Sequence, residues 1–129
     1  MDFRIEFGAD PPADVTVTTS GSADAPKFAM MNGALVGDER FLPGMSVLVD
    51  HSALDTSGLS VDHIRGIART FEGLGDRLGR AGIAIVAPTP LTWGQTRQSI
   101  TLAEETLARV QVFRSKDDAL RWLARDRGE

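Results

Sequence analysis

The sequence predicts a single α/β domain over residues 1–129, in which three main helices pack against a sheet of about five strands. Two apolar runs, residues 45–50 and 82–87, lack polar alternation, which is typical of strands covered on both faces. Between them, residues 60–79 repeat apolar side chains at the three- and four-residue spacing of an amphipathic helix. Strand, helix and strand in this order form a crossover unit, which we expect to be right-handed.

The segments before this unit predict shorter elements. Residues 2–7 alternate apolar and polar side chains and predict a half-buried strand. Residues 14–20 alternate too, and predict a second strand that is exposed on one face. Residues 27–35 predict a third strand. Residues 38–42 predict one short helical turn, which Pro43 closes.

Capping signals define the remaining helices. Ser60 is placed to cap the long helix. Thr92 begins the next helix, with Gln95 three residues on as a capping box. Residues 110–113 predict a short strand, and Ser115 caps a last helix of about residues 116–126. The inner stripe of the long helix comprises Val61, Ile64, Ala68, Phe71, Leu74 and Leu78. The inner stripe of the helix that begins at Thr92 comprises Ile100, Ala103 and Leu107.

Composition excludes several classes of function. Cysteine is absent, which removes disulfides, thiolate chemistry and Cys-based zinc sites. The net charge of −4 disfavours a nucleic-acid surface, because phosphate neutralisation needs a surplus of Lys and Arg. The N-terminus lacks the basic start and continuous apolar run of a signal peptide, and no segment reaches the roughly 18–20 apolar residues of a membrane span. We therefore expect a cytoplasmic protein with no nucleic-acid partner and no integral membrane segment.

Enzyme motifs are weak or missing. Gly73, Gly75 and Gly79 approach a dinucleotide fingerprint, but the spacing differs by one residue and the glycines fall in a predicted helix. The sequence has no Gly-x-Ser-x-Gly elbow that would mark a hydrolase nucleophile. His51 and His63 lack the i, i+4 spacing that places two metal ligands on one helix face. We interpret them as exposed histidines of a polar loop, and predict no catalytic residue, metal site or cofactor.

The segment Asp55-Thr56-Ser57-Gly58-Leu59 precedes the long helix. A phosphate on Ser57 would lie near the N-terminus of that helix, where free amides and the helix dipole favour negative charge. An ordinary turn made by Asp, Ser and Gly accounts for the same residue types. Ser57 is thus either a candidate phospho-switch or part of a structural turn.

A second candidate site follows the strand of residues 82–87. Trp93 and Arg97 lie one turn apart on their predicted helix, so the guanidinium can stack on the indole ring or meet an anion. The preceding loop follows the carboxyl end of a central strand, where open α/β sheets tend to bind ligands. Packing with a surface arginine accounts equally well for the pair. A cleft near Leu91, Trp93 and Arg97 is therefore a candidate site for a small or apolar ligand.

The order and spacing of these segments resemble the SpoIIAA-like, or STAS-like, family of small bacterial domains over roughly residues 27–124. The matching segments are Leu48-Val49-Asp50, Ile64 to Phe71, Ala84-Ile85-Val86, Trp93-Gly94 with Arg97, Val112-Phe113-Arg114 and Ala119 to Leu123. The resemblance implies a mixed sheet with helices packed against it. It also implies non-enzymatic work, which is either protein–protein regulation or the binding of a small or apolar ligand at the end of the sheet. The candidate contacts to a ligand or partner are Asp50, Asp55, Trp93, Gly94 and Arg97.

A more distant similarity is to anti-sigma-factor antagonists, whose switch serine lies in an Asp-Ser-Ser-Gly-Leu loop. The segment from Asp55 to Leu59 resembles that loop and places Ser57 at the switch position, although Thr56 replaces one serine. Antagonists of this kind imply a partner kinase. We therefore expect a regulatory or protein-interaction domain with a protein partner, or alternatively a domain that binds a small ligand. Exposed edge strands can also pair between chains, so monomer and homodimer both stay open.

Overall fold

The computed structural model describes residues 1–102 and 108–126, which form one five-stranded sheet with helices on both faces. The elements are β1 (Asp2–Phe7), β2 (Val15–Ser22), α1 (Ala25–Gly37), β3 (Val47–Asp55), α2 (Val61–Glu72), α3 (Gly75–Leu78), β4 (Gly82–Val86), α4 (Pro90–Leu102), β5 (Arg109–Phe113) and α5 (Lys116–Asp126). The strand order is β1-β2-β3-β4-β5. β1 and β2 pair antiparallel and the other pairs are parallel, which confirms the predicted mixed sheet.

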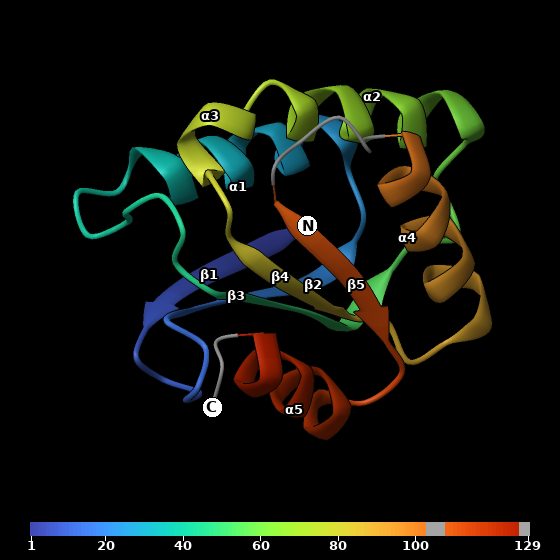
Figure 1. The fold of residues 1–129 in the computed structure, drawn as a ribbon. Coiled ribbons are helices and arrows are strands. Elements are labelled where there is room, and N and C mark those ends of the chain that lie inside the picture. The colour runs from blue at the N-terminus through green and yellow to red at the C-terminus, as the bar shows by residue number, and fades with distance from the viewer. Residues whose placement is uncertain (103–107, 127–129) are drawn as a thin grey trace.

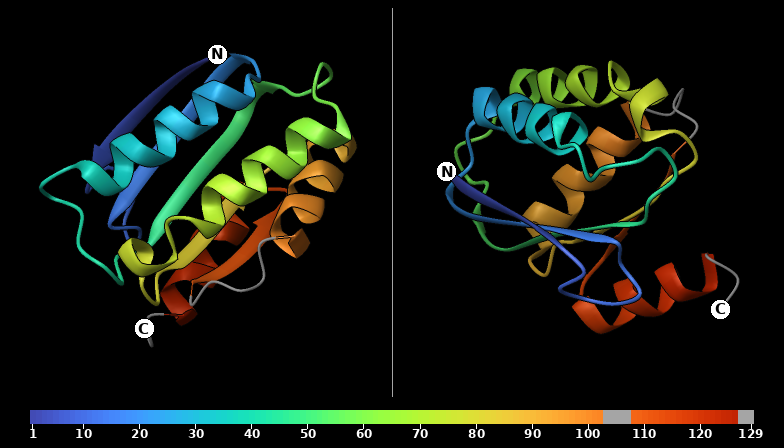
Figure 2. Two further views of the ribbon diagram at one scale, coloured as in Figure 1. Left: turned by 90° about the horizontal axis from the view of Figure 1, so that it is seen from above. Right: turned by 90° about the vertical axis from the view of Figure 1, so that its left-hand side faces the viewer.

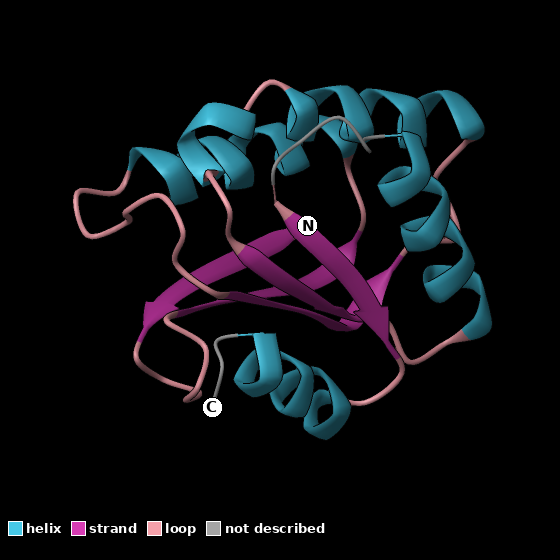
Figure 3. Cartoon of the chain, in the orientation of Figure 1, coloured by secondary structure: helices cyan, strands magenta, loops and turns pink. Residues whose placement is uncertain are grey.

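The two faces of the sheet are covered unequally. Helices α1, α2, α3 and α4 lie over one face (Figures 1 and 2). Of the described helices, α5 alone lies against the other face (Figure 3). Neighbouring residues of the central strands point to opposite sides, so Val47 belongs to the larger core and Leu48 to the core beneath α5. Both side chains are 0% exposed, as the unbroken apolar run predicts.

The crossover unit is confirmed in its order and pairing. β3 and β4 are parallel neighbours, with Val47 opposite Ile83 and Asp50 opposite Val86. Ser60 caps α2, since its hydroxyl oxygen accepts from His63 N at 3.1 Å while His63 Nδ1 accepts from Ser60 N at 3.0 Å. The single helix predicted over residues 60–79 is wrong, because the chain leaves the helix at Gly73 and forms the separate short helix α3.

Residues 27–35 are helical, so the third strand predicted there is wrong. Asp24 caps α1 by accepting from Lys27 N at 3.4 Å, and a proline stands in the first turn of the helix, where its missing N–H is harmless. Phe28, Met31 and Leu35 recur at helical spacing and form the buried stripe of α1.

Residues 38–42 are not helical, so the short helical turn predicted there is wrong as well. The Asp38 carboxylate instead accepts from the backbone N and the guanidinium of Arg40, which holds this segment in a turn.

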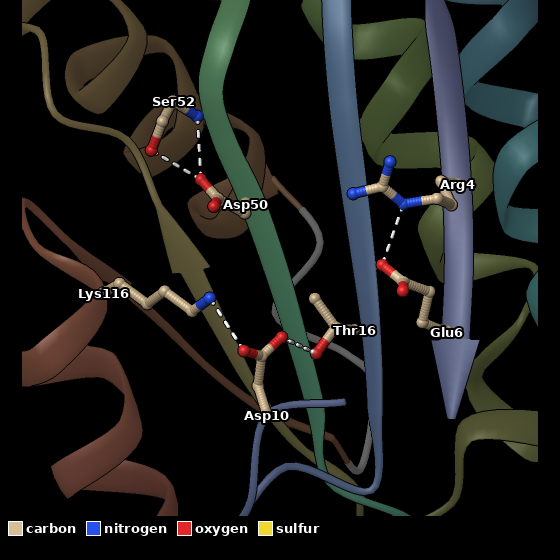
Figure 4. Close-up of polar contacts among 7 residues, drawn as sticks. All are labelled: Arg4, Glu6, Asp10, Thr16, Asp50, Ser52 and Lys116. Carbon is tan, nitrogen blue, oxygen red and sulfur yellow. Dashed lines mark hydrogen bonds and ion pairs between the residues drawn. The ribbon is translucent and has the colours of Figure 1, made fainter. Parts of the chain in front are cut away.

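β2 is buried on both faces, contrary to the exposed face that its alternation predicts. Val15, Thr16, Val17 and Thr19 are all buried. The loop after β1 folds across the face that carries Thr16, and Asp10 accepts from the Thr16 hydroxyl at 2.8 Å (Figure 4). Thr16 and Thr19 therefore look exposed in sequence but have polar partners inside the fold.

Two smaller expectations concern the last helices. α4 begins at Pro90 rather than Thr92, because Thr89 is the capping residue and its hydroxyl accepts from Thr92 N at 3.2 Å. Ser115 caps α5 as predicted, accepting from Asp118 N at 3.2 Å. Ala103 and Leu107, predicted on an inner helix face, lie outside the described residues. No helix among residues 1–102 and 108–126 is long and apolar enough to cross a membrane.

Candidate functional site

A cavity of about 340 Å³ lies between the sheet and helices α1, α2 and α4. Most of its wall is apolar, because the strands and α1 and α2 turn their buried stripes toward it. The apolar lining residues include Phe28, Met31, Val49, Leu59, Ile64, Ile67, Ala68, Phe71, Ile83, Ile85, Ile100, Ala108 and Val110. Its volume falls in the range of small-molecule sites, which run from about 300 to 1,000 Å³.

A polar strip on α4 forms one side of this cavity. Thr92, Gln95, Thr96 and Ser99 share the inner side of α4, and Thr56 faces them from the end of β3. The hydroxyl oxygens of Thr56 and Thr92 lie 2.9 Å apart, and Gln95 Nε2 donates to the Thr56 carbonyl at 3.1 Å. These neutral hydrogen bonds hold α4 against the end of β3.

Gln95 leaves one polar atom without a partner. Its Oε1 is buried and makes no hydrogen bond to the described part of the chain. A buried acceptor without a donor costs roughly 1–3 kcal/mol, so this atom marks a place where the cavity is chemically incomplete.

His51 also lines the cavity and is 7% exposed, so the exposed loop histidine expected at this position is wrong. The reason is that β3 does not end at Asp50 but continues to Asp55 and carries His51 into the core. His51 Nδ1 lies 2.7 Å from Thr19 Oγ1, and the Phe28 ring meets the imidazole edge-on with centroids 5.7 Å apart.

The imidazole of His51 is neutral at physiological pH. Burial lowers its pKa from the ordinary 6.5 to about 4, and the Asp50 carboxylate opposes this only in part. Among the described lining residues there is no Asp, Glu, Lys or Arg. The described wall of the cavity is therefore uncharged.

His63 is exposed, as expected, but it serves as the reciprocal cap of α2. Within residues 1–102 and 108–126, no three His, Asp or Glu side chains gather in a way that could hold a metal ion.

Trp93, Gly94 and Arg97 lie on a different face of α4 and do not line the cavity. The stacking predicted from their spacing is present, because the Arg97 guanidinium lies 4.9 Å from the centre of the Trp93 ring. Arg114 approaches the same ring at 5.1 Å. A contact of these residues with a ligand or partner stays a prediction.

Asp50, Asp55 and Ser57 lie along the end of β3. Asp50 accepts from the backbone N and hydroxyl of Ser52 at 2.9 and 2.5 Å (Figure 4). Asp55 accepts from Ser57 N at 3.0 Å, and hydrogen bonds from Ser57 lower the pKa of this exposed carboxyl. Ser57 is exposed in the turn between Thr56 and Leu59, both of which line the cavity.

Comparison with known proteins bears on the fold. No protein-family model matches the chain, and no curated protein matches it. Among solved structures, it is similar to the crystal structure of an uncharacterised protein of the DUF3478 family from Shewanella loihica PV-4, which has a SpoIIAA-like fold. The identity is 20%, the TM-score is 0.60, and the match covers 94% of this chain and 93% of that one. The chain therefore has the SpoIIAA-like fold that the sequence resemblance implied.

Proposed function

We propose that this domain binds a small, largely apolar molecule in the cavity between the sheet and helices α1, α2 and α4. The observation that carries the proposal is the apolar cavity of about 340 Å³. A molecule that occupies this space would gain dispersion contacts with the lining side chains and would bury its own apolar surface.

Binding without catalysis suits the residues that line the cavity. The described lining offers hydroxyls, amides and one neutral imidazole. The hydroxyl beside His51 belongs to Thr19, which does not line the cavity and is 0% exposed. A nucleophile and its base must both reach a substrate, and this pair does not meet that requirement.

Titration with N-phenyl-1-naphthylamine, an uncharged fluorescent probe, tests the proposal. We expect a saturable rise in fluorescence with one probe per chain. Ala68→Phe should weaken probe binding at least tenfold, because Ala68 lines the cavity and a phenyl group would occupy it. Val61→Phe is the matched control, since Val61 is 51% exposed on the same helix. Equal binding by wild type and Ala68→Phe would contradict the proposal.

A second candidate function is a cytoplasmic regulatory domain that binds a protein partner and is switched by phosphorylation of Ser57. The exposure of Ser57, at the turn before α2, favours it. A phosphate there would stand beside the Asp55 carboxylate and break the hydrogen bonds that Ser57 donates to it, so the turn would rearrange.

Mass spectrometry of protein isolated from its own cells tests this second candidate by searching for phosphate on Ser57. In vitro, Ser57→Asp should change the circular dichroism or amide exchange of the β3–α2 turn. Ser52→Asp is the matched control, because Ser52 is also exposed and bonds an aspartate two residues before it. Unmodified Ser57, together with identical behaviour of the two variants, would contradict the switch.

A further inference from the structure

We infer that the ligand of the cavity is uncharged and presents a hydrogen-bond donor, such as a hydroxyl group, to the free acceptor of Gln95. The inference rests on the proposed binding function and adds the chemistry of the polar end of the ligand. It follows from three features of the cavity wall: the orientation of the Gln95 amide, the tautomer of His51 and the absence of charge among the described lining residues.

The orientation of the Gln95 amide is fixed by its neighbour. The Thr56 carbonyl oxygen can only accept a hydrogen bond, so the amide nitrogen of Gln95 must be the atom 3.1 Å from it. Oε1 then points away from Thr56, buried and without a partner among the described residues. Gln95 lines the cavity, so a ligand whose donor group reaches this acceptor would satisfy it.

His51 supplies a second acceptor. The Thr19 hydroxyl lies 3.2 Å from the Asp50 carbonyl oxygen and 2.7 Å from His51 Nδ1. Because the hydroxyl has one proton and the carbonyl has none, both contacts form only when Thr19 donates to Asp50 and His51 Nδ1 donates to Thr19. The proton of the neutral ring is then on Nδ1, which leaves Nε2 as an acceptor that makes no hydrogen bond within the described part of the chain.

The uncharged wall excludes an ionised ligand. A carboxylate or ammonium group that leaves water for an apolar site loses its hydration and needs an opposite charge there. The described lining offers none, and the acidic pKa of His51 denies the site a cationic imidazole at neutral pH. The acceptor atoms of Gln95 and His51 would also repel the carboxylate of such a ligand.

Three molecules with the same ring system test the inference by displacement of N-phenyl-1-naphthylamine from wild-type protein. They are 2-naphthol, which carries a donor, 2-methylnaphthalene, which carries none, and 2-naphthoate, which is charged. We expect 2-naphthol to bind about tenfold more tightly than either of the others, because one buried hydrogen bond is worth up to about that factor.

Gln95→Met removes the acceptor and keeps a side chain of similar size, so it should abolish the preference for 2-naphthol over 2-methylnaphthalene. Gln98→Met is the matched control, since Gln98 is exposed on the same helix. If the three molecules bind with equal affinity to wild type, or if 2-naphthoate binds most tightly, the inference is overturned while the cavity proposal stands. If neither the probe nor any of the three binds, the proposed function fails and the inference with it.

Discussion

The two faces of the sheet differ in how completely they are filled. Beneath α5, small and medium side chains bring the helix close to the strands, and Leu48, Ala84, Ala119 and Leu123 are all 0% exposed. Over the opposite face the side chains are larger, yet a cavity of about 340 Å³ remains among α1, α2 and α4. The strands contribute alternate residues to the two faces, with Ala84 beneath α5 and Ile83 and Ile85 on the cavity side. One helix over small strand residues packs closely, whereas three helices that meet over bulky residues leave space.

The two faces also differ in the polar contacts that hold their helices in place. α5 is tied down by ion pairs, from Arg109 to Asp126 at 2.6 Å and from Lys116 to Asp10 at 2.8 Å. α4 is held by neutral hydrogen bonds between Thr56, Thr92 and Gln95. Neutral groups suit the wall of an apolar cavity, because an exposed charge there would lose its hydration when a ligand entered. The contrast between the closed face, beneath α5, and the open face, which holds the cavity, agrees with the proposal that a ligand binds over the open face.

The largest expected contrast comes from adding the same phenyl ring to each face. Ala119→Phe should lower the free energy of unfolding by about 3 kcal/mol, because Ala119 is 0% exposed in the core beneath α5, where a phenyl ring would overpack its neighbours. Ala68→Phe should lower it by less than about 1 kcal/mol, because the ring can enter the cavity. Urea unfolding of the two variants measures both. Equal losses would show that the open face is packed as tightly as the closed one.

Between pH 7 and pH 5, acid should affect stability through the open face, since the buried His51 lies there. The pKa of His51 is about 4 in the fold and 6.5 ordinarily, so unfolding takes up a proton between these pH values. Stability is therefore full above about pH 6.5 and declines as the pH falls toward 4. From pH 7 to pH 5 the loss should be about 2 kcal/mol.

Urea unfolding at both pH values measures this loss, and His51→Phe should remove most of it. The ion-paired aspartates do not interfere, because the pKa values of Asp10 and Asp126 are lowered from 3.8 and their contributions are lost only at more acidic pH. A stability that is flat from pH 7 to pH 5 would mean that His51 is not buried as described.

A smaller effect is expected from the neutral contacts that hold α4. Thr92→Val keeps the shape of the side chain but leaves the buried Thr56 hydroxyl without its 2.9 Å partner, which should cost about 1 kcal/mol of unfolding free energy. Thr101→Val is a matched control, because the exposed Thr101 hydroxyl only donates to Arg97 O within the same helix. If the two variants are equally stable, the threonine pair does not hold the helix.

The sequence predicts the features of the two faces that depend on neighbouring residues. It does not predict those that depend on how distant elements pack together. The unbroken apolar runs around Val47 and Ile83 report burial on both faces directly, so the central pair of strands could be predicted. The helix α1 was predictable in principle from Phe28, Met31 and Leu35 at helical spacing after Asp24, but the density of apolar residues favoured a strand.

The cavity is not a local feature, because its volume depends on how far apart α1, α2 and α4 lie over the sheet. One sequence signal does point to it. Thr92, Gln95 and Thr96 place polar groups on the side of α4 that faces the core, where an ordinary amphipathic helix would be apolar. His51 could not be placed without knowing that β3 continues past Asp50. The spacing of Trp93 and Arg97 after a central strand instead predicts a site on a neighbouring face of the same helix.

The smallest expected effect separates these two faces of α4. Arg97→Ala removes an exposed guanidinium that stacks on Trp93, so the unfolding free energy should fall by no more than about 0.5–1 kcal/mol. Affinity for N-phenyl-1-naphthylamine should be unchanged, because Arg97 does not line the cavity. Arg121→Ala, at an exposed arginine on the closed side, gives the background for losing a surface charge. Weaker probe binding by Arg97→Ala alone would restore the ligand contact that the sequence predicts, and would mean that the binding site extends around α4 to Trp93.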